Sequence, residues 1–526
     1  MTQTVLGHKP GVGPVLKCLK HDTDDAMTLP NNAFDRYLFN SENTNLTYTY
    51  ASDPLPFTNA FVSTLPTQFS LYGGTIVGSW TDASFWRTTR MAIRYNALYP
   101  DISYPPISEL REVRNGRIKA GTRRVTLDTD YPNPEQGYVT QYQFNTVTSR
   151  VTGYDASENG NVYTGVIPQS LSGLVGVGEK VVYKAELVYK DGRSDYTLYP
   201  NIYNLPADAT PMPTYSYVPG LVGFEASPTQ FKLMRPGHSI NETGMNKTII
   251  DSNFSPALCV MSGERSGINS IPANGYVFLP APTGVILSET AVLDFMYKLT
   301  DQEWYVPGYI RSGFVKDQRF DLSYSVASNG ITVYNEGSAA VDIRYFVSNV
   351  DRAGTSSGGN QIMFRGNDGV KDFIQFKKPG TSDPASRPND ILFDSRYPTL
   401  HILREGYFSV DEFATVTDAN EARYYGLRRI DIPFENNGLI PYLKFSICYQ
   451  NAWTPPYMKI QYKQSTGWGY PSNRSMLGRV NSNSVSIWAN PGAWTDTRLE
   501  SGNVSYVHIN PDPIGVRYYI FGIPQI

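Results

Sequence analysis

The sequence predicts an all-β protein built from tandem, jelly-roll-like β-sandwich modules, with few short helices. Aromatic residues make up 13% of the 526 residues and charged residues only 18%, a balance that suits sheets better than long helices. The 44 glycines and 37 prolines supply many turns. Several stretches alternate apolar and polar residues, as strands with one solvated face do. A chain of this length has room for about three to four domains.

Charge and hydropathy exclude several classes of partner. The chain has 45 Lys and Arg against 48 Asp and Glu, so it carries no overall positive field that would hold nucleic acid or an anionic membrane. We expect no membrane insertion, because no apolar run approaches the roughly 18 residues that a membrane helix needs. The residues after Met1 show no secretory signal. We therefore expect a soluble protein that is assembled in a cytoplasm.

Alternating stretches follow one another along the chain as strands joined by turns would. Residues 181–189 alternate up to Asp191-Gly192 and the pattern resumes at Tyr196, which predicts a hairpin. Three later stretches predict three consecutive antiparallel strands: residues 320–326, 331–334 and 341–347. Residues 504–508 and 516–520 predict closing strands near the C-terminus.

Two segments bear on helix content. Residues 288–300 fit both a helical spacing and a strand alternation, and we favour the strand because the surrounding sequence is β-rich. Residues 418–424 predict one short helix.

A sequence pattern occurs three times. It consists of a basic residue followed by Pro-Gly, a spacer, two apolar residues, Asp or Asn, Ser, and a short alternating strand. The tripeptides are Lys9-Pro10-Gly11, Arg235-Pro236-Gly237 and Lys378-Pro379-Gly380, and the strands that follow them lie at residues 38–48, 249–260 and 391–402. Pro-Gly fixes a turn and Asx-Ser offers side chains that bond local backbone, so the pattern is typical of the opening of a β-domain.

The repeat predicts how the chain is divided. We expect an N-terminal β module or attachment region at 1–122, a β-rich domain at 123–228, and two repeat sandwiches at 229–374 and 375–526. Nothing in the repeated pattern is nucleophilic or metal-binding.

The third copy carries a family resemblance. Its motifs Leu392-Phe393-Asp394-Ser395 and Tyr397-Pro398-Thr399-Leu400 follow Lys378-Pro379-Gly380, and Tyr518-Tyr519-Ile520-Phe521 comes near the end. In these residues the chain resembles a family of small bacteriophage tail and virion proteins. The second copy departs from the motif by having Ile249-Ile250 in place of Leu-Phe, and the first lacks the Tyr-Pro pair. The resemblance covers about the last 150 residues and implies a virion protein without catalytic residues.

The spacing of the histidines, cysteines, acidic residues and glycines matches no catalytic or metal-binding motif. The five histidines have no HxH or HExxH spacing, and the three cysteines have no CxxC spacing, which argues against zinc and disulfides. The acidic runs at residues 22–25 and 128–130 do not continue into a calcium-binding loop, so a solvated loop is favoured over calcium. Residues 173–178 are glycine-rich but lack a phosphate-binding motif. We expect no cofactor and no metal.

Tryptophans are concentrated near the C-terminus. Four of the seven lie there: Trp453, Trp468, Trp488 and Trp494. Tyr470 lies in the same segment and is grouped with them. Exposed aromatic faces stack against sugar rings or anchor protein interfaces. The same side chains also suit a sandwich core. Glycan contact, protein interface and core therefore remain open for this group.

These observations favour a structural component of a tailed-phage virion, in the tail tip, baseplate or tail fibre, and not an enzyme. The expected partners are other virion proteins and further copies of the same chain, with a trimer as the expected symmetric assembly because fibres commonly use it. One alternative is a receptor-binding adhesin whose Trp-rich module binds a host surface polysaccharide. Others are a head decoration or collar fibre, and a depolymerase with paired carboxylates.

Overall fold

The computed structural model describes nearly all of residues 3–43, the backbone of the strands between residues 48 and 204, and most of residues 216–523. The larger gaps in the last range are residues 307–321, 350–354, 416–427, 455–461, 490–494 and 509–514. The described residues are all-β, and their helices are short 3-10 turns. The all-β prediction is confirmed. Residues 288–300 contain a strand, β20 (Val292–Leu299), as expected, whereas the helix predicted at 418–424 lies outside the described residues.

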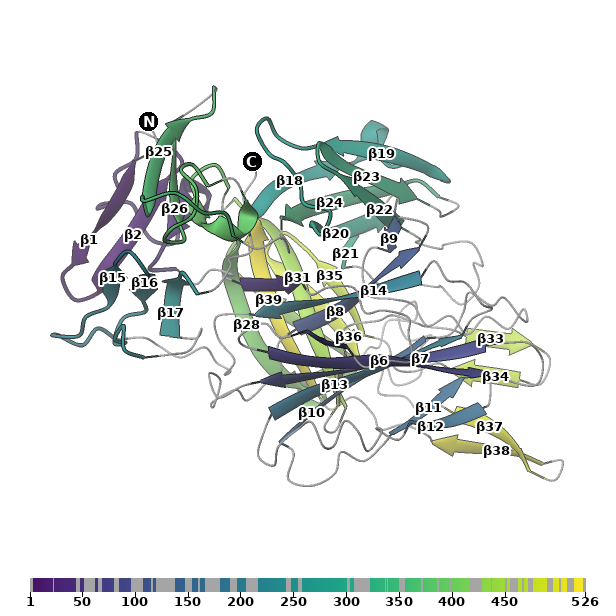
Figure 1. The fold of residues 1–526 in the computed structure, drawn as a ribbon. Helices are drawn as coiled ribbons and strands as arrows, with labels where there is room; N and C mark the ends of the chain where they lie inside the picture. Colours follow the sequence, from purple (N-terminus) through teal and green to yellow (C-terminus); the bar gives the residue numbers. More distant parts are fainter. Residues whose placement is uncertain are drawn as a thin grey trace.

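Three small antiparallel sheets repeat along the chain. Each has three strands, with the second strand in the middle. They consist of β1 (Thr4–Lys9), β2 (Gly13–Leu19) and β3 (Tyr37–Asn40); β15 (Phe224–Ala226), β16 (Phe231–Met234) and β17 (Thr248–Asp251); and β25 (Met363–Asn367), β26 (Asp372–Lys377) and β27 (Ile391–Asp394). Figure 1 shows strands of all three sheets gathered at one end of the molecule, and we call this assembly the hub.

The three small sheets share the same register, including one irregularity at the same place in each. In each, the pairing between the second and third strands shifts by one residue, next to Cys18, Leu233 and Phe376. The serine after the third strand closes the sheet in the same way each time, because its hydroxyl accepts a hydrogen bond from a backbone N–H of the second strand. These bonds join Ser41 to Leu16 at 2.9 Å, Ser252 to Phe231 at 3.1 Å and Ser395 to Ile374 at 2.9 Å. The Asx-Ser part of the repeat thus has a structural cause.

The hub has one hydrophobic core that all three sheets share. Phe39 of the first sheet lies 5.2 Å from Phe393 of the third, and Phe231 of the second lies 5.4 Å from Phe376 of the third, measured between ring centroids. All four rings are buried. Each small sheet belongs to a segment of fewer than about 40 residues, which is too short to bury a sufficient core of its own, so the three copies stabilise one another.

The first Pro-Gly tripeptide does not match the other two in position. Lys9-Pro10-Gly11 forms the turn between β1 and β2, whereas Arg235 and Lys378 come directly after the second strand. The residue that corresponds to them is Lys20. Its amide donates to the carbonyl of Arg36, as Arg235 donates to Lys247 and Lys378 to Asp390. The tripeptide at Lys9 resembles the other two because Pro-Gly suits the turn of a hairpin as well as the turn that follows a second strand.

Each small sheet is followed by a larger module of seven corresponding strands. Module 1 contains β4 (Tyr48–Ala51), β7 (Phe85–Tyr95), β8 (Ile107–Arg114), β9 (Arg117–Lys119), β10 (Tyr138–Thr146), β13 (Lys180–Tyr189) and β14 (Tyr196–Asn204). Module 2 contains β18 (Cys259–Arg265), β19 (Gly275–Pro280), β20, β21 (Trp304–Tyr305), β22 (Leu322–Ala327), β23 (Gly330–Asn335) and β24 (Val341–Ser348). Module 3 contains β28 (His401–Ser409), β30 (Arg428–Pro433), β31 (Ile440–Tyr449), β32 (Ala452–Thr454), β35 (Met476–Val480), β36 (Ser484–Ala489) and β39 (Gly515–Ile523).

The strands of each module pair in one order. Numbered one to seven within a module, they form one sheet in the order 1-7-3-4 and a second in the order 2-6-5. The first strand pairs with the last and the second with the sixth, so the chain wraps as a nested antiparallel ribbon, as in a jelly roll. In module 2 the two sheets enclose a core that includes Leu279, Leu293 and Ile331.

Sheets continue from one module into the next and close a ring. Strand 4 of each module pairs antiparallel with strand 5 of its neighbour: β9 with β22, β21 with β35, and β32 with β10. Module 1 is thereby joined to module 2, module 2 to module 3, and module 3 back to module 1. The single chain is a closed arrangement of three copies of one unit.

Two predictions located strands correctly but paired them wrongly. The predicted hairpin of residues 181–198 is β13 and β14, which lie in different sheets. Of the three strands predicted between 320 and 347, β22 and β23 form a hairpin, whereas β24 pairs with β18 and β20. Strands 6 and 7 belong to opposite sheets of the sandwich, and local alternation is the same whether the chain turns back or crosses over.

The predicted domain boundaries fall inside these structural units. Residue 122 lies between β9 and β10, which correspond to strands 4 and 5 of the other modules. Residues 229 and 375 lie within the second and third small sheets.

Removing the hydroxyl that closes one hub sheet is expected to destabilise the hub. Ser395→Ala leaves the buried N–H of Ile374 without its acceptor, at a cost of about 1–3 kcal/mol. Hydrogen exchange of the β26 and β27 amides measures the loss. Thr229→Ala, in an exposed turn of the second sheet, is the control and should change exchange little. Unchanged protection in Ser395→Ala would contradict the role of this serine.

Candidate functional site

The structure separates the predicted aromatic group. Trp488 lies on β36 and is buried, with the guanidinium carbons of Arg429 and Arg479 5.2 and 4.9 Å from its ring centroid. Trp453 lies on β32, while Trp468 and Tyr470 lie on β34 (Trp468–Pro471); no side-chain surroundings are described for these three. Trp494 lies outside the described residues. For Trp488 the core interpretation is the one that fits.

Several titratable side chains among the described residues are engaged in local structure. Asp24 forms an ion pair with Arg36, and Asp25 accepts a hydrogen bond from the amide of Met27. Burial raises the pKa of the Cys18 thiol to about 11 and that of Cys259 to about 12, so both thiols stay protonated at neutral pH. Among the described residues, no three or more His, Cys, Asp or Glu side chains come together as metal ligands would.

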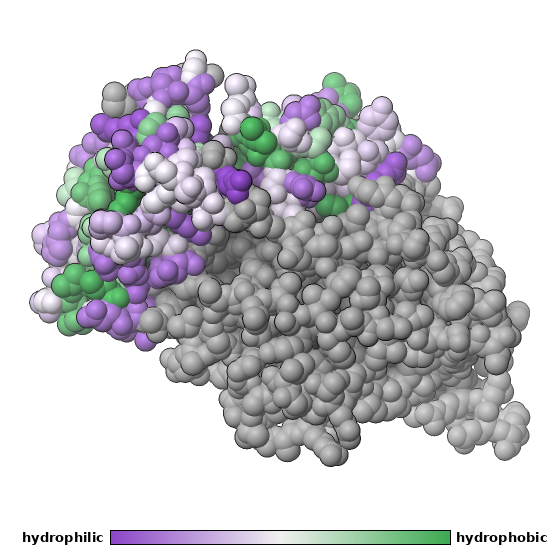
Figure 2. All heavy atoms as spheres, in the orientation of Figure 1, coloured by the Kyte–Doolittle hydropathy of each residue, from purple (hydrophilic) through white to green (hydrophobic). Residues whose placement is uncertain are grey.

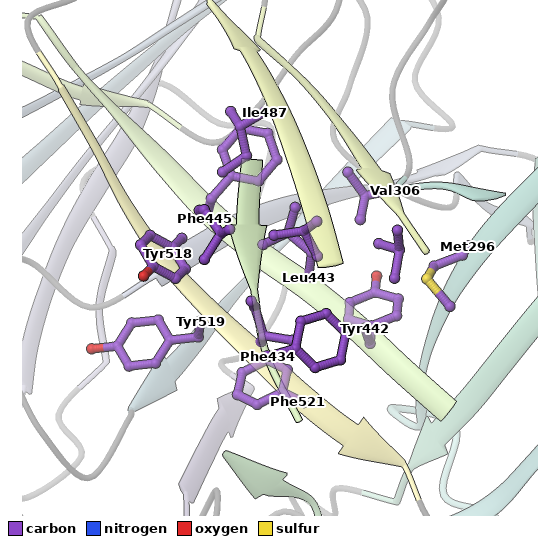
Figure 3. Close-up of a cluster of buried hydrophobic side chains, with 14 of the residues drawn as sticks. Met296, Val306, Phe434, Tyr442, Leu443, Phe445, Ile487, Tyr518, Tyr519 and Phe521 are labelled. Carbon is purple, nitrogen blue, oxygen red and sulfur yellow. The ribbon is translucent and has the colours of Figure 1, made fainter. Parts of the chain in front are cut away.

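A buried ion pair lies in the contact surface between modules 2 and 3, which we call the seam. The Nζ of Lys444 on β31 lies 2.9 Å from Oδ1 of Asp294 on β20, and both side chains are buried. The Tyr442 hydroxyl donates to the carbonyl of Phe295 at 3.4 Å. Figure 3 shows Met296 and Val306 of module 2 beside Tyr442 and Leu443 of module 3 in one apolar cluster. The modules share a core as well as a sheet.

Trp304 belongs to the same seam. It lies on β21, opposite Val480 of module 3, and is buried. The Arg344 guanidinium carbon and the Lys298 Nζ lie 4.3 and 5.1 Å from its ring centroid. Cation–π contacts of this kind fix an aromatic ring between charged groups. Neither Trp304 nor Lys444 could be identified as a site residue from the sequence; the one available signal was a lysine inside the apolar run 439–447.

A buried histidine lies where module 3 meets the hub. His401 begins β28, and its ring centroid lies 5.5 Å from that of Phe34. Neither ring nitrogen has a hydrogen-bond partner among the described residues. Burial lowers the pKa of His401 from 6.5 to about 4, because the charged imidazolium would lose its hydration there. The ring therefore stays neutral and acts as an apolar packing group.

His401 is expected to make stability fall in acid. Its pKa in the folded chain lies below the unfolded value, so its contribution is intact above pH 6.5. The contribution is lost as the pH falls towards 4, by on the order of 3 kcal/mol. Thermal unfolding between pH 4 and 8 measures this loss.

Module 2 supplies the matched substitution. His401 lies opposite Gly522, and the corresponding residue in module 2 is Leu258, whose carbonyl accepts from Asn349. His401→Leu should therefore fold and should flatten the profile between pH 4 and 6.5. An unchanged acid loss in this variant would show that other groups cause it.

Comparisons with family models, curated proteins and solved structures find no match to this chain. No helix among the described residues has the length and apolar character to cross a membrane.

Proposed function

We propose that the chain is a structural component of a tailed-phage virion, in the tail tip, baseplate or tail fibre, that assembles through its β-sandwich modules. The ring of three copies of one module supports this proposal most, because sheets that continue between units are a means of building. The resemblance of the third copy to phage virion modules supports it as well. We propose other virion proteins as partners and no catalytic role.

The ring bears on copy number. A homotrimer is the simplest assembly for a fibre, but this chain already holds three equivalent units in cyclic order. We therefore propose that one chain takes the place of a trimer. Native mass spectrometry of the purified protein should give a monomer of 58.7 kDa. A trimer at micromolar concentration would contradict this stoichiometry.

Locating the chain in a density map of the whole particle tests the proposal. Density for the hub and the three modules at the tail tip, baseplate or a tail fibre is the expected result. Density on the head or collar would support the decoration or collar-fibre alternative instead. Absence of the chain from purified particles would refute a virion role.

A receptor-binding role is the second candidate, favoured by hairpins added to the common module. Module 1 has β11 (Tyr154–Glu158) with β12 (Asn161–Gly165); module 3 has β33 (Tyr462–Ser465) with β34, and β37 (Thr495–Glu500) with β38 (Asn503–His508). Figure 1 shows these hairpins together at the end of the molecule away from the hub. Trp468 and Tyr470 lie on β34, so aromatic residues are concentrated at that end.

Binding of host surface polysaccharide by the full chain tests this second candidate. Trp468→Ala and Tyr470→Ala should each weaken binding while leaving the melting temperature unchanged. Tyr276→Ala, which removes an exposed aromatic ring in module 2, is the control and should bind normally. No binding to any host envelope fraction would count against a receptor-binding role.

A further inference from the structure

Strand 2 has an outer edge in every module, and one of the three edges differs from the others. In module 1, β6 (Phe69–Ser79) pairs with β7 along its whole length. In module 3, β29 (Ala414–Thr415) pairs with the start of β30. In module 2, β19 is the last strand of its sheet, and no described strand pairs with its outer edge. Figure 1 shows β19 at the outer margin of the module.

The lengths of the connections explain this difference. The covering strands belong to the connection between strands 1 and 2, which spans residues 52–84 in module 1 and residues 410–427 in module 3. In module 2 the same connection spans only residues 266–274, with one 3-10 turn. The chain therefore supplies no strand for the third edge from this connection.

The outer edge of β19 has backbone hydrogen-bonding groups that no described strand pairs with. The Ala281 amide donates to the carbonyl of Asn329, its partner across the ladder. Because hydrogen-bonded positions alternate in an antiparallel ladder, the backbone N–H and C=O groups of Val277 and Leu279 also point towards β23. The backbone N–H and C=O groups of Tyr276 and Phe278 then point outwards. Pro280, at the next outward position, has no N–H and suits an edge.

The side chains on this strand favour association. The sequence Gly275–Pro280 carries no charge, and Tyr276 and Phe278 are 68% and 41% exposed. Natural proteins usually guard a long edge with charged residues or cover it. Figure 2 shows hydrophobic residues on the surface in the region that β19 and its neighbours occupy in Figure 1.

We propose that β19 is completed in trans by an extended segment of another polypeptide, which adds antiparallel to its outer edge. Modules 1 and 3 show the occupant of the corresponding position, an antiparallel strand. The segment would carry apolar side chains at alternate positions, over Tyr276 and Phe278, and no charge at its centre. β6, the strand that pairs with β7, likewise has no charged residue. Main-chain hydrogen bonds would give affinity and the aromatic rings selectivity. This inference does not depend on the virion role.

The full chain and a synthetic peptide with the sequence of β6, residues 69–79, test the proposal. Saturable binding at one peptide per chain is expected, with hydrogen-exchange protection of the Tyr276 and Phe278 amides. A scrambled peptide should not bind. Phe278→Pro removes an outward N–H while keeping the ladder to β23, and it should weaken binding at least tenfold.

Two further variants keep the test decisive. Tyr276→Lys places a charge on the edge without touching the backbone, and it should also weaken binding if Phe278→Pro fails to fold. Ile286→Lys changes an apolar residue that is 75% exposed but lies off the strand, and it should bind normally. Absence of saturable binding, or equal binding by the edge variants, would overturn the proposal. A concentration-dependent dimer that Tyr276→Lys abolishes would overturn it in favour of a second copy.

Discussion

Replacing Phe393 by alanine is expected to destabilise all three small sheets together. Phe393 is 1% exposed, and its ring lies 5.2 Å from Phe39 of the first sheet and 6.2 Å from Phe376 of its own. Removing a buried phenylalanine costs about 3–5 kcal/mol. Native-state hydrogen exchange should show a similar loss of protection in β2, β16 and β26, because the copies share one core.

Phe364→Ala is the matched control for this experiment. Phe364 lies on β25 of the same sheet but is only half-buried, so its removal should cost clearly less. If Phe393→Ala loosened β25–β27 and left the other two sheets protected, the hub would be three independent units.

Replacing Lys444 by alanine is expected to open the seam between modules 2 and 3. The variant leaves the buried Asp294 carboxylate without the ammonium that lies 2.9 Å from it, which costs about 3–5 kcal/mol. Exchange of the β20 and β31 amides should rise together, since each module carries one member of the pair. The Asp411→Asn variant breaks an exposed pair with Arg428 within module 3 and should cost less than about 1 kcal/mol.

A double variant separates the charge from the packing. Lys444→Met combined with Asp294→Leu removes both charges and should recover most of the lost stability, because an apolar pair of similar volume carries no desolvation penalty. If Lys444→Ala alone left the exchange of β20 unchanged, the ion pair would not hold the seam.

The sequence was informative about strands and less so about their partners. Alternation located β20, β22, β23 and β24, and the Asx-Ser pattern located the third strand of each small sheet. Alternation depends only on which face of a strand is wet, so it did not distinguish the β22–β23 hairpin from the crossing between β23 and β24. Likewise, no local pattern marks the edge of β21 that pairs with β35 of the next module.

Candidate sites were harder to predict for a related reason. The sequence left Trp488 open between a binding surface, an interface and the core, and its place beside two arginines inside module 3 became evident only from the fold. Asp294 and Lys444 are 150 residues apart in sequence, and only the meeting of two modules makes them a pair. Residue type and spacing report local chemistry, whereas these contacts arise from how the copies are arranged.

Ring closure has a consequence for biosynthesis. The N-terminal module pairs through β10 with β32, so this edge stays open on the ribosome until translation has passed residue 454. β39, which ends at Ile523, is an interior strand of its sheet and pairs with both β28 and β31. A chain that ends before β32 would expose unpaired backbone in the first module, and one that ends before β39 would do so in the third module. Cellular proteases can therefore recognise products whose sheets lack these strands.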